Sequence, residues 1–233
     1  MGLLPGGERG SGGKERWPLL QVVGLTYRWR GEPARREGSA RREGSAWREE
    51  PARREEPAPG SGRGIEGVDL RLERGSLTVV VGRSGAGKTT LLQALLGLLP
   101  REAGEIRWGA VPVADPARTF APPRAAYIAQ ASSSHQWTPG QVMAALPAGR
   151  EMWVIDDLSD ALEVREERAL WDWIFCRHLF WGQGACLAVS NRRPALSRAD
   201  HIIVLEQGRT VGEGRLDELL QSCVEMRCIW GNA

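Results

Sequence analysis

Short apolar runs alternate with polar and glycine-rich segments along most of the chain, and their spacing predicts strands. The segment 77–81 is short, apolar and β-branched, which is typical of a strand buried inside a parallel sheet. The segment 67–72 alternates apolar and polar residues, as a half-buried strand does. Further strands are predicted at 19–29, 105–108, 125–129, 152–155, 186–190 and 202–205.

Longer amphipathic segments lie between these strands and predict helices. One is expected at 88–99, where Pro100 stops it, and another at 163–180. A single last helix is predicted from an apolar face formed by Leu216, Leu219, Leu220, Cys223, Met226 and Trp230. Because strands alternate with helices, the pattern predicts an α/β fold with a mainly parallel sheet and an antiparallel β portion on the N-terminal side.

Two segments lack this pattern and bound the predicted domain. Residues 1–16 are glycine-rich and charged, and we expect a disordered leader there. Residues 31–63 contain tandem copies of RREGSA and two copies of EPARRE, with few apolar residues to bury. A basic arm for nucleic acid or lipid is one interpretation, but glutamates nearly balance the arginines, which favours a solvated insertion. The sequence therefore predicts one domain, 17–233, interrupted at about 31–63.

Composition narrows the class of protein. The chain has 233 residues, a hydrophobic fraction of 42% and a formal net charge of +2, which suits one compact domain and gives no strong indication of nucleic acid as a partner. Its four cysteines show no metal-binding spacing, as expected of reduced thiols in a cytoplasmic protein. The most apolar run, 91–99, is too short to span a bilayer. We expect a cytoplasmic chain that reaches a membrane only through a partner.

The candidate chemistry begins at a phosphate loop. Lys88, one of only two lysines, belongs to a complete G-x-x-x-x-G-K-[ST] pattern between a predicted strand and a predicted helix. Backbone amides of such a loop close around phosphate oxygens, and the helix N-terminus adds positive potential. We expect Thr89 to hold Mg²⁺ through its hydroxyl. The candidate nucleotide-binding residues are Gly82, Arg83, Ser84, Gly85, Ala86, Gly87, Lys88, Thr89 and Thr90.

Two adjacent aspartates supply the second half of the candidate site. Asp156 ends an apolar strand that would lie beside the phosphate-loop strand, where its carboxylate can hold Mg²⁺. Asp157 is the candidate to orient or deprotonate an attacking water. A helix cap followed by a loop is the structural alternative for such a pair, and the phosphate loop upstream makes the Mg²⁺ interpretation the stronger one.

With these motifs the chain resembles the nucleotide-binding subunit of ATP-binding cassette (ABC) transporters, from about Val22 to the C-terminus. The resemblance implies that Trp29 stacks on adenine, with Tyr27 as the alternative, and that Gln130 senses metal and water. It also implies that Asn191 stands in the switch region, within a long matching stretch at 187–214. Segment 159–163 resembles the D-loop.

The chain departs from the family pattern at three places. Asp157 stands where the family has glutamate, so the candidate base is one methylene shorter. Asn191 stands where the family has the switch histidine. Its amide can hydrogen-bond to a γ-phosphate but cannot carry a proton. The interval between Gln130 and Asp156 is shortened, at about 131–150, and holds neither the helical subdomain nor the LSGGQ signature motif.

The resemblance implies an ATPase with Asp157, Gln130 and Asn191 as catalytic residues. ATP and Mg²⁺ are the implied cofactors, and Thr89, Gln130 and Asp156 are the implied metal site. The implied partners are a membrane permease and a second nucleotide-binding subunit, at the inner face of the plasma membrane. Because this chain could not complete a partner's site, a heterodimer with a signature-bearing subunit would be more useful than a homodimer, and we expect hydrolysis to be impaired.

Three alternatives remain open from the sequence. The chain could be a degenerate nucleotide-binding or interaction protein that has lost the motor function. It could be the product of a truncated gene. A phosphate-loop kinase or a nucleic-acid ATPase is the alternative from another class, and the matching C-terminal stretch argues against it.

Overall fold

A computed structural model describes residues 18–29, 64–130, 138–146, 150–158, 162–176 and 184–232. The predicted leader, the whole of the predicted insertion at 31–63 and residues 159–161 of the D-loop lie outside these ranges. The expectations for those segments therefore stay predictions. Within the described residues, no helix is both long enough and apolar enough to cross a membrane.

Six strands form the larger sheet, in the order β10-β9-β3-β8-β7-β6. All neighbouring pairs are parallel except β9 and β10, which form an antiparallel edge. The strands are β3 (Leu77–Val81), β6 (Ala125–Ile128), β7 (Met152–Asp156), β8 (Ala185–Val189), β9 (His201–Glu206) and β10 (Arg209–Gly214). The prediction of a mainly parallel sheet is confirmed.

A second, antiparallel sheet has the order β2-β1-β4-β5 and confirms the antiparallel portion expected on the N-terminal side. Its strands are β1 (Leu20–Arg28), β2 (Gly64–Leu72), β4 (Ala103–Trp108) and β5 (Val111–Pro112). Arg28 pairs with Gly64, so the chain that leaves β1 returns to β2 at the same point. The low-complexity segment is thus flanked by two paired residues.

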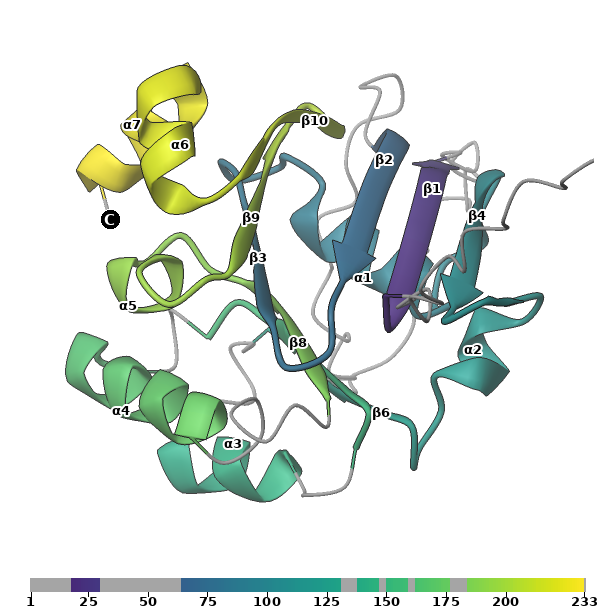
Figure 1. Ribbon diagram of the computed structural model, residues 1–233, viewed down its shortest axis with the longest axis horizontal. Coiled ribbons are helices and arrows are strands. Elements are labelled where there is room, and N and C mark those ends of the chain that lie inside the picture. The colour runs from purple at the N-terminus through teal and green to yellow at the C-terminus, as the bar shows by residue number, and fades with distance from the viewer. Residues whose placement is uncertain are drawn as a thin grey trace, which may run out of the picture.

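Helices cover both sides of the larger sheet (Figure 1). Helix α1 (Lys88–Leu95) lies between the two sheets, whereas α3 (Pro139–Ala145), α4 (Val164–Ile174) and α5 (Arg193–Leu196) lie on the opposite side. The chain ends in α6 (Leu216–Ser222) and α7 (Val224–Asn232), and α2 (Pro116–Thr119) follows the smaller sheet. The central strands are therefore enclosed, as a sheet with apolar residues on both faces requires.

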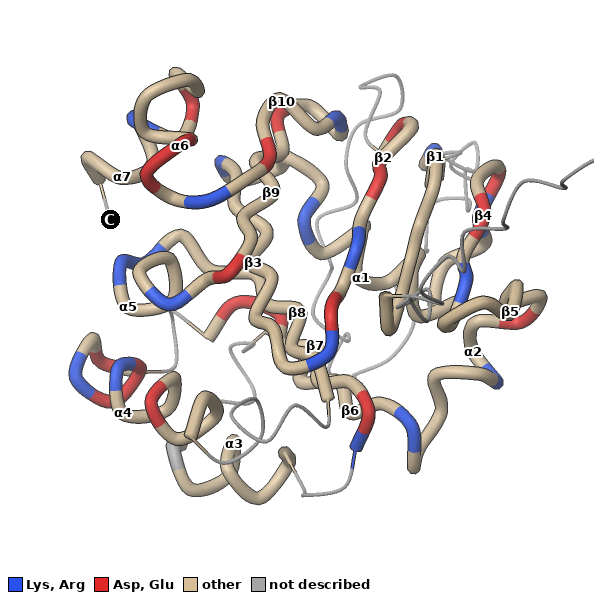
Figure 2. The backbone as a smooth tube through the Cα atoms, viewed as in Figure 1, with Lys and Arg blue, Asp and Glu red and all other residues tan. Residues whose placement is uncertain are grey.

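Two apolar cores result from this arrangement. On β3, Val80 belongs to the core shared with α1 and the antiparallel sheet, while Val79 and Val81 belong to the core beneath α3 to α7. In Figure 2, β3 carries no charged residue. Burial on both faces explains the continuous apolar sequence of this strand and fixes the position at which the phosphate loop begins.

Two of the predicted helices differ in the structure. Helix α1 ends at Leu95 instead of Leu99, because Gly97 adopts a left-handed conformation (φ +73°) that cannot continue a helix. The single last helix is wrong: Cys223 is extended (φ −107°, ψ 118°) and separates α6 from α7. This break keeps Cys223 buried against Gly212 and redirects α7 toward the phosphate loop.

The shortened interval between β6 and β7 contains a helix that the sequence pattern did not predict. Thr138 caps α3 by accepting a hydrogen bond from the Gln141 amide, and the Gln141 side chain reciprocates on the Thr138 amide. The signal was present in the sequence as T-P-G-Q, a capping box with proline at the first turn. Val142 and Leu146 bury this short helix in the same core as α4.

Candidate functional site

The phosphate loop joins β3 to α1 and depends on glycine at particular positions. Gly85 and Gly87 both have positive φ, +80° and +99°. A Cβ at Gly87 would lie 3.1 Å from the Gly64 carbonyl oxygen and 3.1 Å from Cγ2 of Ile65. The loop therefore presses against the start of β2, and this close approach accounts for the glycine that immediately precedes Lys88.

Lys88 closes the loop upon itself. Its Nζ donates hydrogen bonds to the carbonyl oxygens of Gly82 at 2.7 Å and Arg83 at 3.0 Å. Burial lowers the pKa of the ammonium, while the nearby carboxylates of Asp157 and Asp156 act in the opposite direction. The charge is thus held beside the loop amides, where a phosphate would bind.

Asp156 lies at the end of β7 with 1% of its surface exposed. Thr89 Oγ1 donates to Asp156 Oδ1 at 3.1 Å, and the Tyr127 hydroxyl donates to Oδ2 at 3.3 Å. Burial raises the pKa of Asp156, and the two hydroxyl donors offset part of that rise. Burial and the neighbouring Asp156 also raise the pKa of the Tyr127 phenol, so Tyr127 remains a hydrogen-bond donor.

Tyr127 is a site residue that the sequence reasoning missed. It lies on β6, next to β7 in the sheet, and pairs in register with Val154. The signal that could have found it is its place on the strand leading to Gln130, since parallel neighbours present their carboxyl ends together.

Asn191 follows β8 and binds both polar groups of Gly82. Its Oδ1 accepts from the Gly82 amide at 3.1 Å, and its Nδ2 donates to the Gly82 carbonyl at 3.0 Å. The Gly82 carbonyl therefore receives donors from both Lys88 and Asn191. The switch position of the sequence is thereby brought to the first residue of the phosphate loop.

A cavity of about 330 Å³ gathers most of the predicted site residues. Asp157 lines it in a left-handed conformation (φ +34°), with its amide donating to the Val189 carbonyl at 3.2 Å. The lining also includes two residues that were not predicted, Gly64 and Val189. The predicted residues in the lining are Ser84, Gly85, Gly87, Lys88, Thr89, Thr90, Gln130, Asp157 and Asn191.

The two aromatic candidates on β1 occupy different environments. Tyr27 is 8% exposed and belongs to the core between the sheets, so its ring is not free to stack on a ligand. Trp29 is 50% exposed and lies one residue beyond Arg28, the partner of Gly64. Gly64 lines the cavity, whereas Trp29 is not part of its lining.

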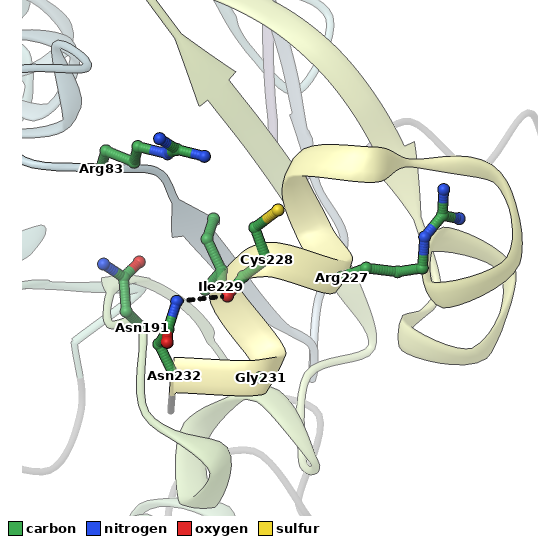
Figure 3. Close-up of a pocket in the computed structure, with 7 residues that line it drawn as sticks. All are labelled: Arg83, Asn191, Arg227, Cys228, Ile229, Gly231 and Asn232. Carbon is green, nitrogen blue, oxygen red and sulfur yellow. Dashed lines mark hydrogen bonds between the residues drawn. The ribbon is translucent and has the colours of Figure 1, made fainter.

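Arg83 points away from the cavity that holds Lys88. Its Nε donates to Glu225 Oε1 of α7 at 2.8 Å. Figure 3 shows its side chain extending from the phosphate loop toward α7, above Cys228, while Arg227 projects from the far side of that helix. These residues, with Asn191, line a second cavity of about 640 Å³. The Arg83 side chain thus lies outside the lining of the cavity that holds Lys88.

The sequence around this site is similar to that of known ATP-binding proteins. The profile of the ABC transporter family matches residues 65–172, which include the phosphate loop, Gln130 and both aspartates. The chain is 38% identical over 148 residues to the cytochrome c biogenesis ATP-binding export protein CcmA of Dechloromonas aromatica. Residues 65–172 are thus an ABC transporter ATP-binding cassette domain. Membership of this family implies ATP binding.

The matches differ in extent. The Dechloromonas alignment covers 60% of this chain and 65% of the relative. A manganese transport system ATP-binding protein, MntB of Listeria monocytogenes, is 43% identical over 68 residues, which are 29% of this chain and 26% of that protein. The chain thus spans less than two thirds of the curated relatives' own length.

Solved structures show the same fold. An ATP-binding cassette of an ABC transporter in its ADP conformation superposes with a TM-score of 0.62 at 12% identity, over 93% of this chain and 99% of that one. A bacterial Atm1-family ABC exporter with ATP bound gives a TM-score of 0.63 at 16% identity, over 91% of this chain and 42% of that one. These likenesses establish the α/β cassette fold and its antiparallel sheet.

The arrangement around Thr89 and Asp156 suits Mg²⁺. Hydroxyl and carboxylate oxygens are the ligands that this cation prefers, and it keeps several waters and substrate phosphates in its remaining positions. No group of three or more His, Cys, Asp or Glu residues that could hold a metal ion by itself is found in the described ranges. Two oxygen donors beside a phosphate loop fit a cation that arrives with its nucleotide.

Proposed function

We propose that this cassette binds MgATP in the cavity at the phosphate loop. The observation that carries the proposal is the placement of Thr89 and Asp156, 3.1 Å apart, directly beside the Lys88 ammonium. The cavity lining thereby combines the Lys88 cation, the Thr89 hydroxyl and a set of loop amides, and Asp156 is buried behind Thr89. Mg²⁺ would supply neutralisation of the phosphate charge.

Each residue has a distinct expected part in binding. The amides of Ser84, Gly85 and Gly87 would donate to phosphate oxygens, and Lys88 would reach the terminal phosphates. Thr89 would hold Mg²⁺ directly and Asp156 through water. Trp29, which is half exposed and follows the strand partner of Gly64, would stack on adenine. Arg83 contributes little to this scheme, since its side chain is engaged with Glu225.

We further propose that the cassette hydrolyses ATP weakly. Asp157 lines the cavity and would orient a water whose oxygen attacks the γ-phosphorus, accepting its proton as the bond to ADP breaks. Gln130 would hold that water and the metal ion, and Asn191 would donate to the γ-phosphate. The short carboxylate of Asp157 and the neutral amide of Asn191 both favour a slow reaction.

A partner subunit would complete the site, in our proposal. The interval between β6 and β7 has α3 as its one helix among the described residues, and its sequence contains no LSGGQ motif. A second, signature-bearing cassette would supply that motif, and a permease would receive the transport step at the inner face of the plasma membrane. The substrate would be selected by the permease.

A non-catalytic nucleotide-binding protein is the second candidate. The two polar groups of the Asn191 side chain are both satisfied by Gly82, an arrangement that stabilises the loop and requires no turnover. In this alternative the cassette binds ATP to regulate or assemble with another protein, and Asp157 is idle.

One pair of variants separates these functions. MgATP affinity by isothermal titration and phosphate release are measured for wild type, Lys88→Ala and Lys14→Ala, the last removing the only other lysine as a matched control. We expect Lys88→Ala to weaken binding by roughly 10- to 100-fold, as the loss of a charge-assisted hydrogen bond does, and Lys14→Ala to leave it unchanged.

Turnover decides between catalysis and binding alone. Phosphate release that disappears in Lys88→Ala and rises in Asp157→Glu supports hydrolysis by this chain. Binding that depends on Lys88 without any release, alone or with a signature-bearing cassette added, supports the non-catalytic function. No MgATP binding by the wild type would refute both.

A further inference from the structure

A buried carboxylate lies outside the cavity and has no part in the proposed nucleotide chemistry. Glu167, on α4, has 2% of its surface exposed. A charged group so far removed from water is costly unless donors surround it. The donors that surround Glu167 therefore indicate which parts of the chain this residue holds together.

Three side chains donate to Glu167, and two of them come from the segment after β8. Oε1 accepts from Trp171 Nε1 at 3.0 Å, within α4, and from Ser190 Oγ at 3.1 Å. Oε2 accepts from Arg192 Nη1 at 3.2 Å in an ion pair. The carboxylate thus joins α4 to the loop that leads into α5.

Ser190 and Arg192 are the residues on either side of Asn191. The Ser190 hydroxyl also accepts from the Arg192 amide at 3.2 Å, which folds this segment into a tight turn around its middle residue. Both flanks of Asn191 are therefore tied to one carboxylate. The amide side chain between them hydrogen-bonds to Gly82 and not to Glu167.

The same network reaches the segment that follows Asp157. Arg192 Nη1 donates to the Leu162 carbonyl at 2.7 Å, and the Leu162 amide donates to the Leu158 carbonyl at 3.1 Å. Through Arg192, Glu167 is thus connected to two further segments that line the cavity, one carrying Asp157 and one carrying Asn191.

We propose that Glu167 is the positioning residue for Asn191. It holds both neighbours of Asn191 so that the amide side chain faces Gly82 and the expected place of the γ-phosphate. Glu167 itself contacts no nucleotide, and what Asn191 contacts in the bound state rests on the proposed function. A neutral amide, which has no charge to draw it to a phosphate, depends on such a fixed direction to contribute.

The first test needs no nucleotide. In Glu167→Gln the amide nitrogen faces Arg192, so the ion pair is lost while an acceptor for Trp171 and Ser190 remains. The hydrogen exchange of the Gly82 amide, which donates to Asn191, is followed by NMR. We expect exchange at Gly82 to become about tenfold faster, the change that corresponds to one lost hydrogen bond.

The matched control removes another ion pair between the same two parts of the chain. Asp172, also on α4, pairs with Arg198 beyond α5, and neither residue touches the flanks of Asn191. Asp172→Asn should leave the Gly82 exchange at the wild-type rate. Equal acceleration in both variants, or none in Glu167→Gln, would overturn the proposal.

The second test measures discrimination between nucleotides. If Asn191 faces the γ-phosphate, Glu167→Gln and Asn191→Ala lower the preference for ATP over ADP by a similar factor and leave ADP affinity unchanged. The double variant should then lose no more than either single one. A general loss of structure would weaken the binding of ATP and of ADP alike, and that result would count against a positioning role for Glu167.

The two proposals can fail separately. If wild type binds neither nucleotide, the proposed function is refuted while the Gly82 exchange still decides the role of Glu167. If Glu167→Gln does not fold, Arg192→Gln breaks the same ion pair from the more exposed side, whose side chain is 27% accessible. Unchanged Gly82 exchange in Arg192→Gln would then reject the proposal.

Discussion

The Nε of Arg83 lies 2.8 Å from Oε1 of Glu225, which fastens α7 to the phosphate loop across 142 positions of the sequence. The guanidinium is largely in solvent, whereas the Glu225 side chain is 8% exposed. At the other end of α7, Trp230 lies against Arg193, whose guanidinium carbon is 4.9 Å from the ring centroid. The helix is therefore attached both to the phosphate loop and to α5.

This attachment predicts how little Arg83 contributes to nucleotide binding. Because its side chain faces α7, Arg83→Gln should change MgATP affinity by no more than about twofold, as expected for an exposed ion pair. The amides of α7 should meanwhile exchange faster. Isothermal titration calorimetry measures the MgATP affinity of this variant, and hydrogen exchange measures the protection of the α7 amides. A large loss of affinity would place the Arg83 side chain on the nucleotide instead.

The exposed indole of Trp29 predicts a stacking contribution that Tyr27 does not make. Trp29→Ala should weaken ATP binding by roughly 1–3 kcal/mol, the usual contribution of one aromatic stacked on a base. Trp29→Phe should retain most of the affinity. Tyr27→Phe, in the core beside it, should have no effect on binding. An equal loss in Trp29→Ala for ATP and for inorganic triphosphate would exclude stacking.

Two glycines of the phosphate loop offer a matched comparison of stability. Both need a left-handed backbone, so alanine at either one should cost about 1–2 kcal/mol of unfolding free energy. Only Gly87 also lies against Gly64 and Ile65, whereas a Cβ at Gly85 meets nothing within 4 Å. Urea unfolding should therefore show a larger loss for Gly87→Ala than for Gly85→Ala. Equal losses would show that the loop and β2 separate readily in solution.

The buried Asp156 predicts a pH dependence of stability. Its folded pKa is raised, chiefly by burial, so the folded state holds the proton more tightly than the unfolded chain does. This contribution to stability is complete below the ordinary carboxyl pKa and is lost as the pH rises through the folded value. Asp156→Asn should remove the dependence and raise the Tm at neutral pH, while weakening Mg²⁺-dependent ATP binding. Thermal unfolding across pH, with and without the substitution, provides the measurement.

The strands were predictable because their signal is local. The run at 77–81 is β3 to the residue, and Met152–Asp156 extends the predicted 152–155 by one position. Both are buried on two faces, so apolar sequence and strand coincide. The phosphate loop was equally predictable, because its glycines mark positions whose backbone conformations other residues avoid.

What the sequence did not predict depends on contacts across the fold. The apolar residues of α6 and α7 keep the spacing of a single helix across the break at Cys223. The periodicity of the sequence therefore does not show the break. Arg83 lies inside the phosphate-loop motif, yet its partner Glu225 is far along the chain. Tyr127 reaches Asp156 because β6 pairs with β7 in the sheet, and the sequence does not give this strand order. The direction of a side chain and the order of strands in the sheet decide which residues meet at the site. The spacing of residues along the sequence gives neither of them.

The pairing of Arg28 with Gly64 has a consequence for the history of the gene. Strand hydrogen bonds hold the two ends of the intervening segment together whatever its length, and lengthening a closed loop costs little free energy. Copies of RREGSA can therefore be gained or lost by slippage during replication without shifting the register of β1 against β2. The connection between Arg28 and Gly64 is thus a position at which the cassette tolerates added sequence without any change in its strand pairing.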